Sequence, residues 1–567
     1  MSQTACATGV FPLPFCALGS GTRRATGERM TSMTRRVVSG CGLFLLFAAC
    51  GDMTGDRSPG IPLADGGMFY YDAGGGYPRS DGGAAIDSGP PEVEEVRSFE
   101  TPRAGARYVY VANPRRDTVA VIDSTTLAIR SVEAGDGPTY LSVVPGRDVA
   151  VVLNVGSDDA TILRTDGAGT RTSTVPVVHG TNALAVAPDG LHAIAWLDTS
   201  TAGSGIGTGS FQDITLIDLA DAGDRAVDLT VGFRPLEIVY SQDGATAFVV
   251  TEDGISIVHF ADITTPTIVP LVPIDDASGP FARDVSITGD GRYALVRSEG
   301  ESVVRLVELA GAVSTSMDVG VPITDVDLSP TGAFALVVLR ETSTLLRIPL
   351  PAGFSDPTQI VATTFADEVF GSVTITPDGR RALLYTTATP VERLIVVDLD
   401  DASAEAPRIV RLRKGVRAVG VSPDGSTAVI VHTRIDGDPS DPTVDLDTRI
   451  DRSFGYTMLD LRSGFAKLQI TEAEVGPLAL SPDGAYAFTF LRDDAASVRV
   501  LQRIALASFL VDGYALGSPP LSLGIVPATS RAFVGQLHPE GRIGFLEWET
   551  GALVSVTGFE LNGRISE

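Results

Sequence analysis

The sequence predicts an all-β fold in which four-stranded antiparallel sheets repeat around a ring, a β-propeller. The first observation is a recurring turn, which reads SPDG or TPDG in its best copies, and the second is the alternation of apolar residues on both sides of it. The third is spacing, because successive copies lie 41 to 59 residues apart. All-strand repeats of about 40 to 50 residues are typical of propeller blades. The copies lie at Pro145, Pro188, Gln242, Gly289, Pro330, Pro377, Pro423, Pro482 and Pro527.

Each copy of the turn predicts a β-hairpin. Proline presets φ, aspartate hydrogen-bonds back to the backbone, and glycine accepts the left-handed conformation. The segment LALSPDGAYAFTFL, Leu478 to Leu491, shows apolar residues alternating on both sides of the turn. Alternation around a tight turn is typical of two paired strands.

Two further strands follow each hairpin. In the unit that begins at Asp284, the hairpin is followed by SVVRLVEL and then STSMDVG. One four-stranded sheet cannot cover both of its faces, whereas stacking such sheets around a ring buries both. We count about ten units in residues 99–567, which predicts one closed ring of eight to ten blades, with two smaller rings as the alternative. The segment VRSFE at Val96 could complete a blade with the last strands, near Leu553 to Leu561.

The first unit carries a family resemblance. It reads RYVYVANPRRDTVAVID from Arg107, and it resembles the YVTN repeat of bacterial surface-layer-type β-propellers. Tyr108 to Asn113 match the YVYVAN strand of that repeat, and Thr118 to Asp123 match its second strand. Later units keep the hairpin but do not have the YVYVAN motif. The resemblance implies a propeller for residues 105–560 and implies little about function.

Charge and cysteine content exclude several classes of function. The chain has 43 basic and 70 acidic residues and a net charge of −27, which repels phosphate backbones, so we expect no nucleic-acid partner. The cysteines are Cys6, Cys16, Cys41 and Cys50. Because none lies beyond Cys50, the body has no disulfide, no CxxCH haem site, no cysteine zinc site and no cysteine nucleophile.

The N-terminal region, residues 1–49, has the layout of a signal peptide. From Met33 the chain reads MTRRVVSGCGLFLLFAACGD, which is two arginines, a short apolar run and then Cys50. This resembles a bacterial lipoprotein signal, although Phe47 stands where leucine is usual, and it implies lipidation of Cys50; an ordinary cleaved signal is the alternative. We interpret residues 1–32 as an over-long start. Gly51 favours the outer membrane, with the protein periplasmic or surface-exposed.

Residues 50–98 predict a tether between the lipid and the body. Glycine, proline, serine and aspartate dominate this segment, as in DAGGGYPRSDGGAAIDSGPP, and no apolar period is sustained. Such a composition buries too little apolar surface to offset the entropy of ordering. Contact with the membrane is therefore expected through the lipid anchor only.

Two insertions interrupt the repeat between the second and third strands of their units. They are residues Asp198 to Asp213 and Arg434 to Gly455. Because equivalent connections emerge on one face of a propeller, we expect that face to contact a partner, with the two loops across the channel mouth from each other in a ten-blade ring. The second loop holds Asp436, Asp438 and Asp441, which are weak candidates for a calcium site. Arginines of the same loop could pair with these acids instead, and a solvated acidic loop is the preferred interpretation.

No catalytic set is recognisable in the sequence, so we assign no catalytic or cofactor-binding residue. The histidines fall in different units without an HxH or HExxH pairing, and there is no GxSxG elbow. We therefore predict a lipid-anchored cell-envelope binding or scaffold protein that recognises an envelope protein, a polysaccharide or a small ligand. The alternatives are a propeller hydrolase of the lactonase type with a channel-mouth site, and a purely structural envelope component.

Overall fold

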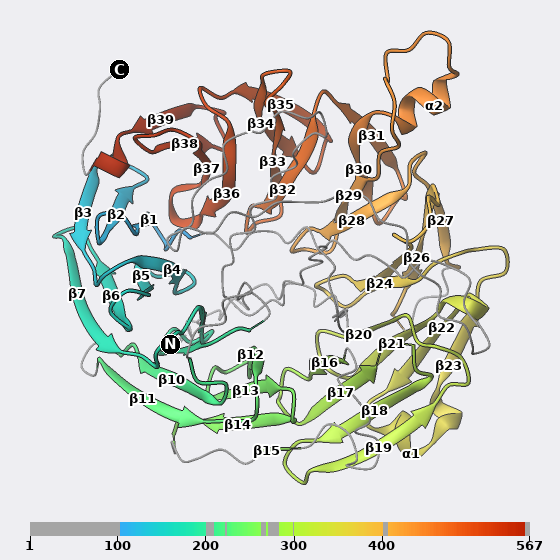
Figure 1. The fold of residues 1–567 in the computed structure, drawn as a ribbon. Helices are drawn as coiled ribbons and strands as arrows, with labels where there is room; N and C mark the ends of the chain where they lie inside the picture. The colour runs from blue at the N-terminus through green and yellow to red at the C-terminus, as the bar shows by residue number, and fades with distance from the viewer. Residues whose placement is uncertain are drawn as a thin grey trace, which may run out of the picture.

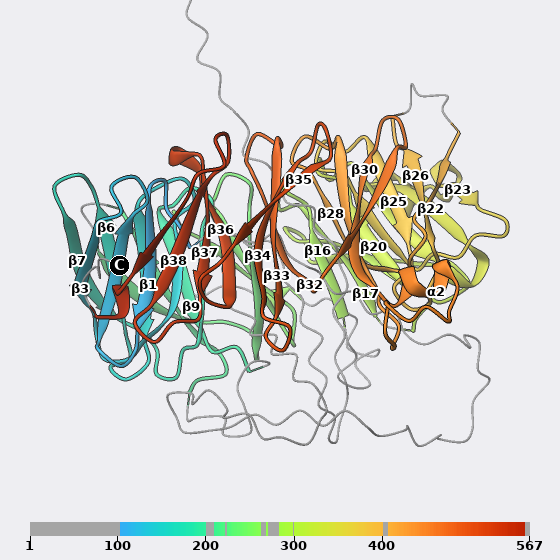
Figure 2. The same cartoon turned by 90° about the horizontal axis from the view of Figure 1, so that it is seen from above.

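The computed structural model describes residues 103–199, 209–220, 224–261, 268–269, 283–298, 300–400 and 406–561. In this part of the chain, ten antiparallel sheets stand around a common axis and form one ring (Figure 1). Seen edge-on, the strands cross the thickness of a disc (Figure 2). The predicted all-β propeller is confirmed, and ten blades lie at the upper end of the predicted range. The signal region, Cys50, the tether and Val96 lie outside the described residues.

The blades are numbered 1 to 10 in chain order, and the first strand of each lies nearest the axis (Figure 1). Blade 1 is β1 (Tyr108–Asn113), β2 (Thr118–Asp123) and β3 (Ile129–Glu133), and blade 2 is β4 (Pro138–Val143), β5 (Val149–Asn154), β6 (Asp159–Thr165) and β7 (Thr170–Pro176). Blade 3 is β8 (Ala183–Val186), β9 (His192–Trp196), β10 (Asp213–Asp218) and β11 (Arg225–Thr230), and blade 4 is β12 (Pro235–Tyr240), β13 (Thr246–Thr251), β14 (Ile255–His259) and β15 (Ile268–Val269). Blade 5 is β16 (Arg283–Ile287), β17 (Tyr293–Ser298), β18 (Val303–Glu308) and β19 (Val313–Asp318).

Blade 6 is β20 (Asp325–Leu328), β21 (Phe334–Leu339), β22 (Thr344–Pro349) and β23 (Val361–Thr364), and blade 7 is β24 (Ser372–Ile375), β25 (Arg381–Tyr385), β26 (Arg393–Asp398) and β27 (Arg408–Arg411). Blade 8 is β28 (Val416–Val421), β29 (Thr427–His432), β30 (Phe454–Asp460) and β31 (Ala466–Thr471), and blade 9 is β32 (Glu474–Leu480), β33 (Tyr486–Asp493), β34 (Val498–Ala505) and β35 (Leu510–Ala515). Blade 10 is β36 (Pro520–Val526), β37 (Arg531–Gln536), β38 (Arg542–Glu547) and β39 (Leu553–Thr557). The described helices are short: α1 (Ala352–Ser355), α2 (Leu446–Asp451), η2 (Arg340–Thr342), η3 (Pro357–Gln359), η4 (Pro527–Thr529) and η5 (Phe559–Leu561).

The first blade differs from the other nine, which each have four strands. Its sheet is β1–β2–β3, and its inner edge carries a single antiparallel bridge from Ala104 to Val109. The last blade has its own four strands, β36 to β39, and is complete without the segment at Val96.

The recurring turn joins the first and second strands of a blade, as predicted, and its side chains lock it. In blade 8 the Ser422 hydroxyl donates to the carboxylate of Asp424 at 2.6 Å and accepts from the amide of Thr427 at 3.0 Å. Gly425 follows with φ of 66°, the left-handed conformation that glycine adopts without strain. The repetition of the motif in sequence is therefore the repetition of one locked turn.

The same glycine also allows neighbouring turns to approach closely. A Cβ atom added to Gly425 would lie 2.6 Å from Cγ of Asp378, which belongs to the turn of the preceding blade. Gly244 meets Asp189 in the same way, at 2.8 Å. Glycine is thus needed both for its φ angle and for the contact between blades.

Apolar packing closes the ring. Ten hydrophobic clusters are found among the described residues, and each is shared by two adjacent blades. The cluster that joins blade 10 to blade 1 combines Phe533 and Phe545 with Val109 and Ile122. Because every blade buries both of its faces in this way, the repeat forms a single closed body rather than two rings.

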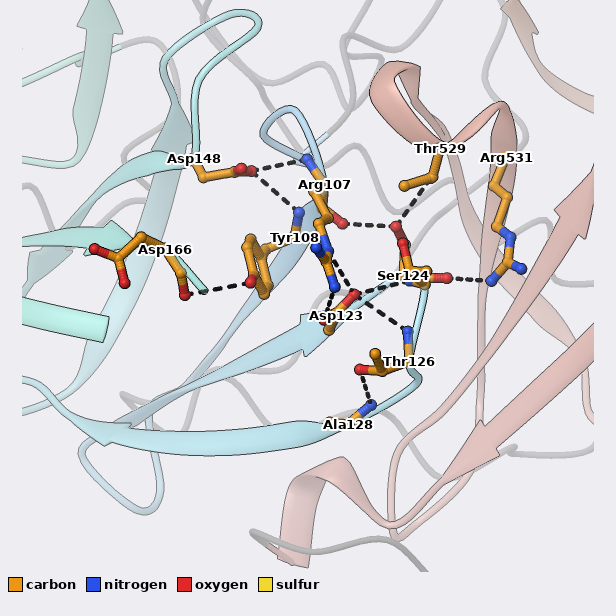
Figure 3. A network of polar contacts seen from close by, with 11 residues as sticks. Arg107, Tyr108, Asp123, Ser124, Thr126, Ala128, Asp148, Asp166, Thr529 and Arg531 are labelled. Atoms are coloured by element: carbon orange, nitrogen blue, oxygen red, sulfur yellow. Dashed lines mark hydrogen bonds and ion pairs between the residues drawn. The ribbon is translucent and has the colours of Figure 1, made fainter. Parts of the chain in front are cut away.

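A polar network spans the same junction (Figure 3). The Arg531 guanidinium of blade 10 donates to the carbonyl oxygen of Ser124 in blade 1. The Ser124 hydroxyl donates to the carbonyl of Arg107 at 2.6 Å and lies 2.9 Å from the hydroxyl of Thr529. Ser124 is fully buried, so these bonds satisfy polar atoms that water cannot reach.

The ring has two faces with different connections. The turn face carries the locked turns and the connections between third and fourth strands. The insertion face carries the connections between second and third strands and those from one blade to the next. Blades 3 and 8 hold the two predicted insertions, five blades apart on this face. In the blade-8 insertion, α2 projects outward beyond the outer strands of the ring (Figure 1).

Candidate functional site

Exposed apolar side chains distinguish the insertion face from the turn face. Sixteen large apolar side chains are exposed among the described residues, and eight of them lie on outermost strands. The turn face carries two of the others, Leu191 and Phe465. The insertion face carries six, which are Val155, Phe233, Val369, Ile435, Leu446 and Leu537. These six side chains stand on connections of different blades around the ring, except that Ile435 and Leu446 share the blade-8 insertion.

The blade-8 insertion is an ordered loop built from short local turns. Asp438 accepts from the amide and hydroxyl of Ser440, and Asp441 accepts in the same way from Thr443. Asp445 caps α2 by accepting from the amide of Thr448 at 2.8 Å. These hydrogen bonds lower the pKa of all three carboxyls, so they are ionised at neutral pH.

The arginines of the insertion hold the loop together from within. Arg434 donates to the carbonyl of Arg452 at 2.8 Å and lies over the ring of Phe454 at 4.4 Å. Arg449 donates to the carbonyl of Pro439 at 3.1 Å. The guanidinium of Arg452 lies 3.5 Å from the carboxylate of Asp441. Of the predicted pairs between arginines and acids of this loop, the structure shows Arg452 with Asp441, and the other arginine contacts are to backbone carbonyls.

Lys414 supports the insertion from below. Its side chain is buried, at 1% exposure, and its ammonium donates to the carbonyls of Ile450 at 2.7 Å and Asp451 at 3.0 Å. Burial lowers the pKa of this amine to about 8, because desolvation penalises the charged form. A cation at the C-terminal end of α2 also complements the helix dipole. Lys414 thus ties the loop to the connection between blades 7 and 8.

His432 lies beside this anchor, at the end of β29. It is 4% exposed, and its Nδ1 atom lies 3.1 Å from the carbonyl of Gly415. Because a carbonyl only accepts, Nδ1 carries the proton, and Nε2 accepts from the Thr457 hydroxyl at 2.7 Å. Burial lowers the pKa of the ring to about 4. His432 is therefore a neutral structural residue at the base of the loop.

The calcium candidates lie in separate local turns. Asp438 and Asp441 each use one carboxylate oxygen for the turn that follows, and Asp436 is exposed four residues after β29 ends. In the described part of the chain, no group of three histidine, cysteine, aspartate or glutamate side chains is placed to hold a metal ion. The structure brings these acids into one loop without gathering them around one point.

The blade-3 insertion is described at its two ends only, since residues 200–208 lie outside the described part. At its start Asp198 and Asn182 are joined by two hydrogen bonds of 2.6 and 3.0 Å. At its end Phe211 contacts Phe233, and the guanidinium of Arg234 lies over both rings at 5.8 and 5.1 Å.

A shallow groove of about 450 Å³ lies on the insertion face between Glu472 and the second-to-third-strand connection of blade 9, and Arg499 is part of its lining. It is too open to enclose a small ligand in the way that a buried pocket does. We therefore assign it no ligand.

The remaining histidines stand apart in different blades. His179 pairs with Asp158 at 2.7 Å, His192 stacks on Phe260, and His259 lies near Thr246. Trp196, at the end of β9, and Trp548, one residue past β38, pack in clusters between blades.

Comparisons with known proteins assign no family to this chain. No protein-family model matches the chain, and no curated protein does. Among solved structures, hydrazine synthase of Kuenenia stuttgartiensis is 15% identical with a TM-score of 0.32, covering 57% of this chain and 95% of that chain. Dihydro-heme d1 dehydrogenase NirN in complex with DHE is 14% identical with a TM-score of 0.37, and the match covers 73% of this chain and 76% of that chain. A eukaryotic initiation factor is 12% identical with a TM-score of 0.45, and the match covers 79% of this chain and 95% of that chain. None of these similarities transfers a function to this chain.

Proposed function

We propose that this protein is a cell-envelope binding or scaffold protein that recognises a partner protein with the insertion face of its propeller. The observation that carries the proposal is the distribution of exposed apolar side chains between the faces, six against two in the described residues. Apolar contacts with a polar rim are typical of protein partners, whereas nucleic acid would be repelled by the net charge of −27.

The ordered blade-8 loop supports the same proposal. Lys414, Arg434 and Arg449 donate to backbone carbonyls of the loop, so its backbone is held in place without a partner. A preorganised loop loses less conformational entropy on binding than a mobile one does. An ordered projection with exposed Leu446 fits a contact surface better than a simple connection between strands.

Attachment to the membrane is the second part of the proposal. The signal-like segment and Cys50 would place the protein outside the inner membrane on a lipid anchor, with residues 51–98 as the tether. Within the described residues, no helix has the length and apolar character needed to cross a bilayer. Metabolic labelling with a radioactive fatty acid should label the wild type and not the Cys50→Ser variant. Equal labelling of both proteins would contradict lipidation at Cys50.

Binding is tested by chemical cross-linking of the mature protein in envelope extract. The wild type is compared with a variant in which residues 435–452 are replaced by a short glycine-serine link, and with a control that shortens the turn-face connection at Phe465 in the same way. The proposal expects a discrete cross-linked partner that is lost only from the first variant. Equal capture by all three proteins would contradict it.

A further inference from the structure

Two exposed apolar side chains lie along α2 at the outer edge of the insertion face. Leu446, the first residue of α2, is 65% exposed, and Ile435 is 47% exposed. The amide of Ile435 donates to the carbonyl of Asp451 at 3.1 Å, so Ile435 lies beside the other end of the helix. A helix of this length spans roughly 9 Å, so the backbones of Ile435 and Leu446 lie at opposite ends of one short helix.

Exposed aspartates are the sequence neighbours of both apolar residues. Asp436 follows Ile435, and Asp445 and Asp447 stand on either side of Leu446; all three are exposed. Asp445 is ionised at neutral pH, since its hydrogen bonds to Thr448 lower its pKa. We call this set, Ile435, Asp436, Asp445, Leu446 and Asp447, the α2 patch.

The three arginines of the loop offset only part of its negative charge, because residues 434–452 hold six aspartates. Arg434 and Arg449 donate to backbone carbonyls of the loop, and Arg452 contacts Asp441 and the carbonyl of Asp438. Lys414 is buried under the end of α2. The α2 patch therefore presents apolar side chains with negative charge around them, in a protein that is itself strongly negative.

We propose that the α2 patch binds a basic amphipathic segment of the partner protein, with apolar residues that cover Leu446 and Ile435 and lysine or arginine residues that meet the surrounding carboxylates. This inference rests on the proposed function, because it names the partner of the same face. Charge complementarity selects the occupant: a basic segment is attracted, whereas acidic protein surfaces and anionic lipid headgroups are repelled.

The test is binding of synthetic peptides to the full-length protein, followed by fluorescence anisotropy. The first peptide is an amphipathic helix of leucine and lysine; in the second glutamate replaces lysine, and in the third serine replaces leucine. The first is expected to bind, more weakly as salt rises, and the other two are expected to bind at least about tenfold more weakly.

Variants locate the binding site. Ile435→Ser with Leu446→Ser should weaken binding of the first peptide by about tenfold, because two apolar contacts are lost. Leu510→Ser is the matched control, since Leu510 is 63% exposed but lies on the outermost strand of blade 9. Asp436→Asn with Asp447→Asn should make binding of the first peptide depend less on salt concentration. Glu341→Gln is the control and should leave that dependence unchanged, because Glu341 is exposed on the same face but in the blade-6 turn.

The outcomes separate this inference from the proposed function. Loss of binding in the α2-patch variants alone supports the inference. Equal binding by the wild type and all variants would show unspecific attraction to an acidic protein and would overturn it, as would the absence of binding by the wild type. If cross-linking still captured a partner in either of those cases, the insertion face would keep its role and only the chemistry of the partner would be wrong.

Discussion

The ammonium of Lys414 lies 2.7 Å from the carbonyl oxygen of Ile450, and this contact joins the ring to the insertion that projects from it. Lys414 lies in the connection that leads into β28, and Ile450 is in the last turn of α2. The contact therefore joins a buried residue of the ring, Lys414, to Ile450 of the insertion, 36 positions further along the chain.

Replacement of this lysine should loosen the loop while the ring stays intact. Lys414→Met keeps most of the apolar stem but removes the donors to Ile450 and Asp451. We expect amide hydrogen exchange in residues 446–453 to accelerate by roughly tenfold or more, the effect of losing a charged hydrogen bond. The control is Lys467→Met, because Lys467 donates to the carbonyl of Phe509 instead. Unchanged exchange in Lys414→Met would show that the loop does not depend on this contact.

His432 should make the fold less stable in acid. Its pKa is lowered to about 4 from the ordinary 6.5, so the unfolded chain takes up a proton at higher pH than the folded protein does. The free energy of unfolding should therefore fall as pH decreases from about 6.5 to about 4, by roughly 3 kcal/mol in total. Denaturant unfolding at several pH values measures this fall.

Carboxylates with lowered pKa also destabilise the protein in acid, so the histidine contribution needs a comparison of variants. His432→Gln should flatten the pH dependence of the free energy of unfolding, because glutamine takes up no proton in this range. Parallel curves for the wild type and His432→Gln would be inconsistent with a buried neutral imidazole.

The repeated glycine should matter most where two turns meet. Gly425→Ala places a Cβ atom 2.6 Å from Cγ of Asp378, while Gly146→Ala, at a similar φ of 68°, meets no atom within 4 Å. Both changes carry the cost of a left-handed residue, about 1 to 2 kcal/mol. Gly425→Ala should lose about 1 to 3 kcal/mol more from the contact between blades. Equal losses in denaturant unfolding would mean that the neighbouring turn simply moves away.

Ring closure should depend on Arg531. Arg531→Met leaves the buried carbonyl of Ser124 without this donor, which should cost about 1 to 3 kcal/mol of the free energy of unfolding. Arg225→Met is the control, since Arg225 is 79% exposed and its pair with Asp218 is long, at 3.5 Å. The control should change stability by less than about 0.5 kcal/mol. Thermal unfolding that shifts equally in both variants would contradict a special role for the junction.

The sequence predicted the fold well because the repeat is local. The turn at Ser422 to Gly425 is stabilised by residues within five positions of one another, and the strands beside it alternate in a way that any copy reveals. Closure by Arg531 and Ser124 could not be predicted, because it joins residues 407 positions apart in the first and last repeats, and the pattern within one repeat does not show which units meet.

The site was predicted only in outline. Both insertions and their shared face follow from the repeat, but the role of Lys414 depends on a contact that spacing does not show. Its one sequence signal is rarity, since Lys414 and Lys467 are the lysines of the chain. The exposure of Leu446 could not be predicted, because a leucine in a loop can as easily fold back onto the ring.

Site-specific photo-cross-linking tests the central claim most directly. A photoreactive phenylalanine derivative is placed at Leu446 on the insertion face, at Phe465 on the turn face, or at Leu510 on the outer strand, and cells that produce each protein are irradiated. The account predicts a discrete cross-linked partner from position 446 and none from positions 465 and 510. A partner that appears from position 465 or 510 but not from position 446 would contradict the assignment of the insertion face.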